Sequence, residues 1–373
     1  MKILLITQLF PFKKGIKETS GAIREFAEEW GKMGHLVKVL RPHFSYEKEP
    51  FPDNPNFHIS NNIEVNFIKP FRIPLLKLIW YSRKKTEQFI SFKPDIIICH
   101  LYNSYFTFHW LAEKLNIPLI IGIHISDIKI SNNKFHRWHQ NLIFKKSSAF
   151  ACRSYSVNKL FQKQFPKFKR KTFIALSGIP EEFLNNRVKK KNNKKIRIIS
   201  ISSLIKRKQI DKVLLALFNL PENIDWEYII IGSGPKQQNL KSLIKKLNLT
   251  DNVKMFAHKP RKNIIKELDQ SDIFILPSYH ETLGLVYLEA MARGCITIGS
   301  INSGVDGIII DKENGFLCDP YNNQSIRDKL IMALSLDNNE KVKIINNAKE
   351  TVSSFTIKKK SEEYIENISK FLK

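Results

Sequence analysis

Short runs of β-branched and other apolar residues alternate along this chain with stretches in which apolar residues recur at helical spacing. This alternation is typical of parallel sheets joined by crossover helices, so it predicts the α/β fold class. The strands predicted in the first half are 2–7, 35–40, 63–69, 95–100, 118–124 and 149–153. Those predicted in the second half are 196–202, 227–231, 253–257, 273–277 and 296–300. Each half thus predicts an open, doubly wound, Rossmann-like sheet whose carboxyl ends face a ligand cleft.

The chain of 373 residues is long enough for two such domains. Between them, residues 177–195 contain Ser-Gly-Ile-Pro and then a run of lysine and asparagine, a composition that predicts a linker. We therefore expect an N-terminal domain over 1–176 and a C-terminal domain over 196–352. Apolar residues at helical spacing predict an amphipathic helix within 353–373 (Tyr364, Ile365, Ile368 and Phe371).

The formal net charge of +26 is the outlier of the composition. A basic surface attracts nucleic acid, anionic lipid or phosphorylated small molecules, and the total alone does not choose among them. Lysine-rich usage is also what an AT-rich genome produces. The four cysteines are far apart in sequence and lie in apolar runs, so we expect reduced core residues.

No run of about 18 uncharged apolar residues occurs, which argues against a membrane-spanning helix. The apolar run at the N-terminus is too short for a signal peptide. We therefore expect a cytoplasmic location.

The segment 277–294 is the most informative part of the sequence. A buried strand is followed by a turn and then by a helix that begins near Gly284 and ends at Gly294. The backbone N–H groups at the start of this helix are suited to holding a phosphate. Glu281 in the turn and Glu289 in the helix would suit sugar or ribose hydroxyls, because a carboxylate accepts hydrogen bonds from neighbouring diols. The alternative is that both are ordinary surface residues.

This segment resembles the E-x7-E signature of the family 4 glycosyltransferases, which are retaining enzymes of the GT-B fold that use nucleotide sugars. The matches are Glu281, Gly284-Leu285, the run 289–292 and Gly294. The resemblance implies that Glu281 contacts the donor sugar and Glu289 the ribose. It also implies that the backbone of Leu283, Gly284, Leu285 and Val286 holds the diphosphate.

A second loop, 202–211, resembles the family's G-R-L-x-x-x-K-G-x-D motif. The resemblance places Lys208 at the lysine that neutralises the donor diphosphate, where a fixed positive charge stabilises the leaving group. Ser203 stands where the family has an arginine. Either Arg207 or Lys206 compensates, or the site has one charge fewer; we expect Arg207 in the donor site. Without the resemblance, a lysine in a loop is ordinarily solvated.

Two positions in the N-terminal half also match the family. Gly21 precedes the first predicted helix, as in the family's glycine-rich beginning, and is expected to border the donor site. His124 ends a predicted strand and begins His-Ile-Ser-Asp, which resembles the family's H-G-x-D. The resemblance implies that His124 contacts the transferred hexose, and that Asp127 orients it or binds the acceptor. A lone histidine after a strand is otherwise more often structural.

The resemblance as a whole implies a hexosyltransferase that needs no cofactor besides its nucleotide-diphosphate-sugar donor. With no Asp-x-Asp at a strand end, no metal is expected. We predict a lipid-linked or polysaccharide acceptor in cell-envelope glycan biosynthesis. The mixture of cations and large apolar residues in 71–85 predicts peripheral contact with the inner, anionic face of the plasma membrane, unless it is only a solvated helix.

Two other functions are alternatives. One is a GT-B nucleotide-sugar epimerase or hydrolase, which would share the cleft but lacks the E-x7-E segment. The other is a basic nucleic-acid-binding protein, which the absence of a recognisable nucleic-acid-binding module disfavours. We accordingly expect no nucleic-acid partner.

Overall fold

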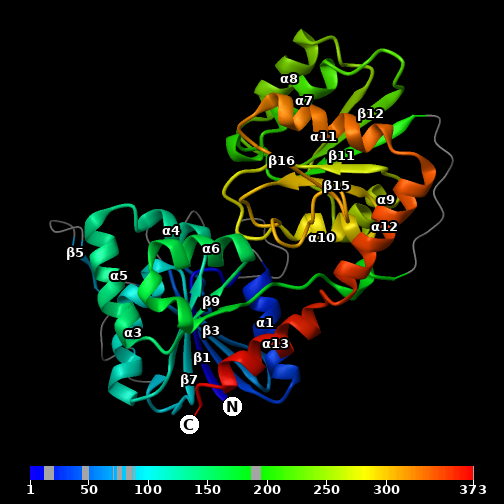
Figure 1. Cartoon of the computed structure of the whole chain (residues 1–373). Helices are drawn as coiled ribbons and strands as arrows, with labels where there is room; N and C mark the ends of the chain where they lie inside the picture. Colours follow the sequence, from blue (N-terminus) through cyan, green and yellow to red (C-terminus); the bar gives the residue numbers. More distant parts are fainter. Residues whose placement is uncertain are drawn as a thin grey trace. The chain divides into compact units, whose positions relative to one another are not determined.

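The computed structural model describes residues 1–11, 21–43, 50–69, 71–73, 78–80, 86, 89–185 and 195–372. These residues divide into two compact α/β units (Figure 1). Unit 1 contains residues 1–153, 157–178 and 357–373, and unit 2 contains residues 154–156 and 179–356.

Unit 1 is built on an eight-stranded sheet in the order β10-β9-β8-β7-β1-β2-β4-β3. Every pair in this sheet is parallel except β3 with β4. The strands are β1 (Lys2–Thr7), β2 (Leu36–Pro42), β3 (Asn56–Ser60), β4 (Ile63–Ile68), β7 (Ile96–His100), β8 (Leu119–Ile123), β9 (Ala149–Cys152) and β10 (Thr172–Ile174). A separate two-stranded antiparallel sheet joins β5 (Phe71–Ile73) to β6 (Leu78–Trp80).

Two hydrophobic cores cover the two faces of the large sheet. One core is completed by α3 (Tyr102–Leu115), α5 (Lys134–Lys146) and α6 (Tyr155–Gln164). The other is completed by α1 (Ala22–Lys32) and the C-terminal helix α13 (Ile357–Ser369). The ring of Tyr364 lies 5.2 Å from that of Trp30, and the Trp30 indole donates a hydrogen bond to the Ser361 carbonyl. The apolar stripe on the last helix therefore packs against the first helix of the same unit.

Unit 2 is built on a six-stranded, entirely parallel sheet in the order β13-β12-β11-β14-β15-β16. Its strands are β11 (Ile196–Ile201), β12 (Trp226–Ile231), β13 (Val253–Phe256), β14 (Ile273–Ile275), β15 (Ile296–Ser300) and β16 (Phe316–Cys318). Its helices are α7 (Ile210–Phe218), α8 (Gln237–Lys246), α9 (Arg261–Asp269), α10 (Leu285–Ala292), α11 (Asn323–Ser335) and α12 (Asn338–Ser353). The strand order reverses between β11 and β14, which is where open α/β sheets bind ligands.

The strands predicted from hydrophobic runs are all present, and both doubly wound sheets are confirmed. The prediction missed β3, β5, β6, β10 and β16. The last four have only three residues each, too few for a periodic signal. β5 and β6 lie in 71–85, where a solvated helix was the alternative to membrane contact, so the described part of that segment is a strand pair and not a helix. All four cysteines are buried thiols that form no disulfide, as expected.

The segment predicted as a linker is partly folded. Ile179 pairs with Thr356 in an isolated bridge. Ile179 and Phe183 are both buried in unit 2 because their side chains are apolar. Residues 186–194 of that segment lie outside the described residues. Among the helices in the described ranges, none combines the length and apolar character that crossing a bilayer requires.

Candidate functional site

Two loops from neighbouring strands meet at the switch point of the unit 2 sheet. The loop after β11 carries Arg207 and Lys208 in a short 3-10 turn, Lys206–Lys208. The loop after β14 carries Glu281. Because β11 and β14 are adjacent and parallel, the sheet brings these side chains together.

Three donors converge on one carboxylate oxygen, Oε2 of Glu281. Arg207 Nη1 lies 2.5 Å from it and Lys208 Nζ lies 2.6 Å from it. The Ser278 hydroxyl donates a third hydrogen bond of 3.2 Å. Lys206, although it neighbours Arg207, is exposed. Of the two cations that could replace the family's missing arginine, the structure brings Arg207 to this group.

Burial sets the electrostatics of this group. The Lys208 side chain is 9% exposed and that of Glu281 is 13% exposed. Burial alone would raise the pKa of Glu281, but the charges and hydrogen bonds of Lys208 and Arg207 outweigh it and hold that pKa below its ordinary value. Burial lowers the pKa of Lys208, and Glu281 only partly offsets this effect. The carboxylate is therefore charged at neutral pH and already neutralised by cations.

Several residues that the sequence did not single out hold the Glu281 loop in place. Ser278 also bonds to the buried Tyr287 hydroxyl at 2.9 Å, and the Glu281 backbone N–H donates to the Ser303 hydroxyl at 3.2 Å. Gly304 approaches the Leu283 backbone so closely that a Cβ atom would lie 2.5 Å from it. Serine and glycine in strand-following loops give no sequence signal for such contacts, apart from their place after a buried strand.

The N-terminus of α10 lies directly after Glu281 in sequence. Gly284 is its N-cap residue, with φ at 85°, and the cap makes no side-chain hydrogen bond. Leu285 and Val286 begin the helix, and the buried Leu283 precedes the cap. Glu289, on the second turn of the helix, is half-buried. The turn-and-helix arrangement predicted for 277–294 is present. The first N–H groups of a helix have no partner within the helix, so the start of α10 suits a phosphate.

In unit 1, His124 follows β8 and is the N-cap residue of α4 (Ile125–Ile130). The Asp127 carboxylate accepts a hydrogen bond of 2.8 Å from the His124 backbone N–H and one of 3.3 Å from the Tyr105 hydroxyl. Asp127 is 1% exposed, and burial raises its pKa to about 7. Asp127 therefore caps the turn that carries His124, and its role toward the histidine ring or the acceptor stays a prediction.

A second histidine, which lies in none of the sequence motifs, contacts His124. Nδ1 of His100, the last residue of β7, lies 3.0 Å from Nε2 of His124. Burial and then the charge of Arg153 lower the pKa of His124 to about 3, so its ring is neutral at physiological pH. His100 and Arg153 are each the last residue of a predicted strand, and this position was the sequence signal that could have pointed to them.

Gly21 is the N-cap residue of α1 and is exposed. Its φ of −64° is open to any residue, and a Cβ atom would meet only the Glu25 side chain at 3.7 Å. The backbone conformation thus does not require glycine. Residues 12–20, which precede it, lie outside the described residues.

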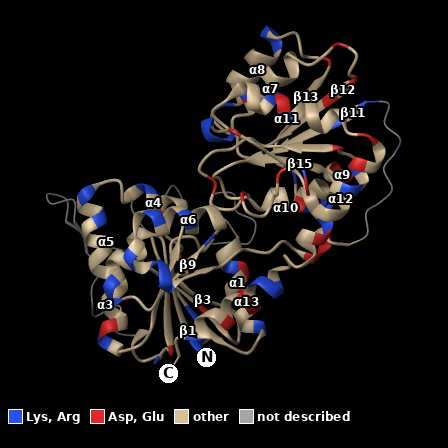
Figure 2. Ribbon diagram, in the orientation of Figure 1, with Lys and Arg blue, Asp and Glu red and all other residues tan. Residues whose placement is uncertain are grey.

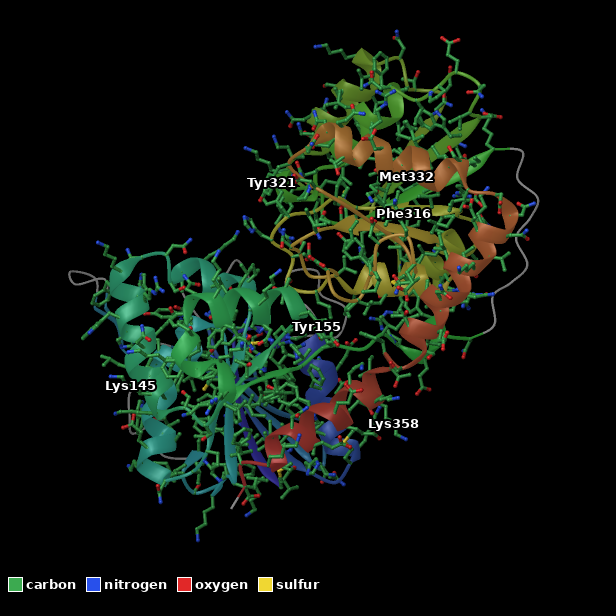
Figure 3. All side chains as sticks on the ribbon, in the orientation of Figure 1. Lys145, Tyr155, Phe316, Tyr321, Met332 and Lys358 are labelled. Atoms are coloured by element: carbon green, nitrogen blue, oxygen red, sulfur yellow. The ribbon has the colours of Figure 1, made fainter. Side chains whose placement is uncertain are left out.

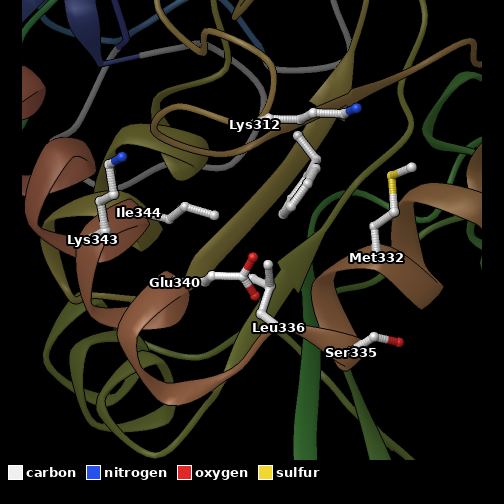
Figure 4. Close-up of a pocket in the computed structure, with 8 residues that line it drawn as sticks. Lys312, Met332, Ser335, Leu336, Glu340, Lys343 and Ile344 are labelled. Atoms are coloured by element: carbon white, nitrogen blue, oxygen red, sulfur yellow. The ribbon is translucent and has the colours of Figure 1, made fainter.

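A surface hollow in unit 2 lies apart from these residues. Figure 4 shows it beside the amino end of β16, and none of the predicted site residues lines it (Lys312, Phe316, Met332, Ser335, Leu336, Glu340, Lys343 and Ile344). In Figure 3, Phe316 and Met332 mark its place in the unit. Among the described residues, no three His, Cys, Asp or Glu side chains gather so as to hold a metal ion.

Comparison with known families decides the relationship. The family described as "Glycosyltransferase Family 4" matches residues 22–182, and "Glycosyl transferases group 1" matches residues 182–351. The chain belongs to the family 4 glycosyltransferases. The resemblance found in the E-x7-E segment is therefore confirmed.

Two curated relatives, both named as glycosyltransferases, match parts of the chain. An uncharacterized glycosyltransferase of Haemophilus influenzae is 36% identical over 159 residues, which are 42% of this chain and 44% of the relative. The putative colanic acid biosynthesis glycosyltransferase WcaL of Escherichia coli is 25% identical over 276 residues, which are 70% of this chain and 66% of the relative. The chain thus spans less than two thirds of the length of either.

Solved structures of the GT-B fold match nearly the whole chain. Sucrose-phosphate synthase of Thermosynechococcus elongatus has a TM-score of 0.75 at 16% identity, covering 99% of this chain and 98% of that one. HepE of Anabaena, in complex with UDP and glucose, has a TM-score of 0.73 at 18% identity, covering 99% of each chain. The family 4 chain therefore has the predicted GT-B fold.

Proposed function

We propose that this protein is a retaining glycosyltransferase that moves a hexose-type sugar from a nucleotide-diphosphate sugar to a glycan acceptor. One observation carries the proposal: Glu281, held by Lys208 and Arg207, lies at the switch point of the unit 2 sheet and is followed by the start of α10, whose cap makes no side-chain hydrogen bond. This group combines fixed cations and backbone N–H donors for a diphosphate with a carboxylate for sugar hydroxyls.

In the proposed chemistry, donor binding changes the hydrogen-bond partners of Lys208, Arg207 and Glu281. When a donor binds, Lys208 and Arg207 turn from Glu281 to the diphosphate, and the freed carboxylate accepts hydrogen bonds from the sugar. As the bond between the sugar C1 and the phosphate oxygen breaks, the two cations and the α10 N–H groups stabilise the growing negative charge. Glu289 holds the ribose hydroxyls, and His124, a neutral imidazole whose backbone N–H donates to Asp127, contacts the hexose.

The donor base is proposed to be uracil. The complex of HepE with UDP and glucose supports this choice, because that protein shares the fold of this chain. The site needs no cofactor besides the donor. The acceptor is proposed to be a lipid-linked or polysaccharide precursor of a cell-envelope glycan, which the name of WcaL supports.

We also propose that the protein works at an anionic membrane surface. The segment predicted for this contact, 71–85, lies in part outside the described residues, and its described residues form β5 and β6. Support comes from α5 instead, where Phe135, Trp138 and Leu142 are 61%, 57% and 40% exposed. Their spacing places them on one face of the helix. Phe106 of α3 is also exposed, and its ring centroid lies 4.3 Å from that of His139 in α5.

We call the surface formed by Phe106, Phe135, Trp138 and Leu142 the aromatic face. The positive charge around it suits acidic lipid. Residues 128–180 contain twelve Lys and Arg and neither Asp nor Glu. Figure 2 shows cations along α5, and Figure 3 shows Lys145 at the outer side of that helix. Exposed aromatic side chains among lysines are typical of surfaces that enter the interfacial region of a bilayer.

A screen of nucleotide sugars tests the proposed reaction. UDP-, GDP- and dTDP-sugars are added to the full chain, and thermal stabilisation and release of nucleoside diphosphate are measured. At least one UDP-sugar should raise the unfolding temperature and be hydrolysed slowly without acceptor. Conversion of the sugar to an epimer without transfer would favour the epimerase alternative. Binding of RNA or DNA without any response to nucleotide sugars would favour the nucleic-acid-binding alternative.

A further inference from the structure

Three nitrogen-bearing side chains lie side by side at the carboxyl edge of the unit 1 sheet. His100 ends β7, His124 follows β8 and Arg153 follows β9, and these three strands are neighbours. Gly122 in β8 makes room for His100, since a Cβ atom there would lie 2.1 Å from its Nδ1. The edge is next to the switch point between β1 and β7, the other position where a doubly wound sheet binds a ligand.

Arg153 is buried, and none of the Asp and Glu side chains in the described ranges forms an ion pair with it. The residue is 3% exposed, and its Nη2 donates to the Ser177 hydroxyl. The guanidinium also lies 4.7 Å from the centroid of the Phe26 ring. Its Nη1 is enclosed and has no hydrogen-bond partner, and no carboxylate among the described residues pairs with it. Arg293, which is equally buried, instead pairs with Asp269 at 2.6 Å.

The charge on Arg153 persists despite this burial. Burial lowers its pKa to about 10, which still leaves the guanidinium charged at neutral pH. A buried charge without a counter-ion costs several kcal/mol, so folded proteins rarely keep one without a use for it. His100 contributes a second unsatisfied atom, because its enclosed Nε2 has no partner either.

We propose that His100, His124 and Arg153 form a binding site for an anionic group of the acceptor, a phosphate or a carboxylate. This inference rests on the proposed function. Oxygen atoms of an anion would satisfy the free nitrogen of Arg153 and supply the missing counter-charge. His124, 8% exposed, is also the residue proposed to contact the hexose, so one histidine would take part in both contacts. An acceptor without an anionic group would leave the arginine uncompensated and bind more weakly.

The test uses the full chain with isotope-labelled histidine and follows the imidazole resonances of His100 and His124 by NMR. The probes are inorganic phosphate, inorganic pyrophosphate and glucuronate. At least one should shift both resonances. Arg153→Met should weaken that binding by about 10- to 100-fold, the loss of a charge-assisted hydrogen bond. Arg170→Met, which removes an exposed cation from the same unit, should leave it unchanged. A preference for the phosphates or for glucuronate would identify the source of the anion.

Stability separates a binding role from a structural one. If Arg153 is kept for an anion, Arg153→Met should not lower the unfolding temperature of the unliganded protein, because it removes an uncompensated buried charge. A lower unfolding temperature with unchanged probe affinity would overturn the proposal, as would a wild-type protein that responds to none of the probes. UDP binding, measured separately, reports on unit 2, so loss of the proposed donor function would be recognised independently.

Discussion

The Nζ atom of Lys208 lies 2.6 Å from Oε2 of Glu281, and both side chains are almost entirely buried. Neither residue carries the site alone. The lysine offsets the cost of burying the carboxylate, and Arg207 adds a second cation on the same oxygen. A donor diphosphate competes with Glu281 for these cations, so donor binding and the state of this carboxylate are coupled. The predictions about unit 2 follow from this competition.

Lys208→Ala should lower turnover more than donor affinity. Negative charge builds on the diphosphate as the glycosidic bond breaks, so the lysine stabilises the transition state more than the bound donor. We expect a loss in kcat of about 100-fold or more, as for removal of one preorganised electrostatic contact. Steady-state kinetics and calorimetry of donor binding provide the measurement, with Lys212→Ala in α7 as the control. Equal losses in both quantities would mean uniform binding.

Arg207 and Lys206 should differ, although they are adjacent cations. Arg207 contacts Glu281, whereas Lys206 is exposed in the same turn. Arg207→Ala should weaken binding of nucleoside diphosphate by about tenfold, consistent with a lost hydrogen bond between charged groups. Lys206→Ala should change it less than twofold. If the two substitutions have the same effect, the missing arginine at Ser203 is compensated by general positive charge and not by Arg207.

Asp127 should make stability depend on pH. Burial raises its pKa to about 7, above the value of about 4 that it has in the unfolded chain. Its contribution to stability is therefore fully present below about pH 4 and is lost as the pH rises through 7, by up to about 4 kcal/mol. Asp127→Asn, which keeps the cap of His124, should flatten this dependence. Urea unfolding of both proteins between pH 5 and 8 measures it, and identical slopes would contradict the assignment.

The aromatic face should bind vesicles that contain acidic lipid. Replacing Phe135, Trp138 and Leu142 with serine should abolish most flotation, and high salt should weaken it, because exposed charges are screened beyond roughly 8 Å in physiological buffer. Phe218→Ser, at an exposed aromatic residue of unit 2, is the control. A further variant with Lys77, Arg83, Lys84 and Lys85 replaced by serine tests the predicted segment. Flotation of the α5 variant at the parent level would remove this support for membrane contact.

Sequence patterns were sufficient for the longer strands of both sheets and for the strand-to-helix turn that carries Glu281. Buried strands of five or six residues give a clear apolar run, and the strand-to-helix turn around Glu281 and Gly284 has a recognisable spacing. Contacts between loops gave no such signal. Ser278 and Ser303 support Glu281 only because distant strands place them there, and Arg153 becomes notable only once its burial without an acid is known.

The comparison of Glu281→Gln with the parent protein tests the central claim most directly. Calorimetry measures UDP affinity, and an assay of donor hydrolysis measures turnover, with circular dichroism to check folding. Because the substitution releases Lys208 and Arg207 from a competing carboxylate, UDP should bind as tightly as before or more tightly. Hydrolysis of the donor should fall by about 100-fold, since the sugar loses its positioning contact. A parallel loss of UDP affinity and hydrolysis would contradict the account and make Glu281 a structural support for the cations.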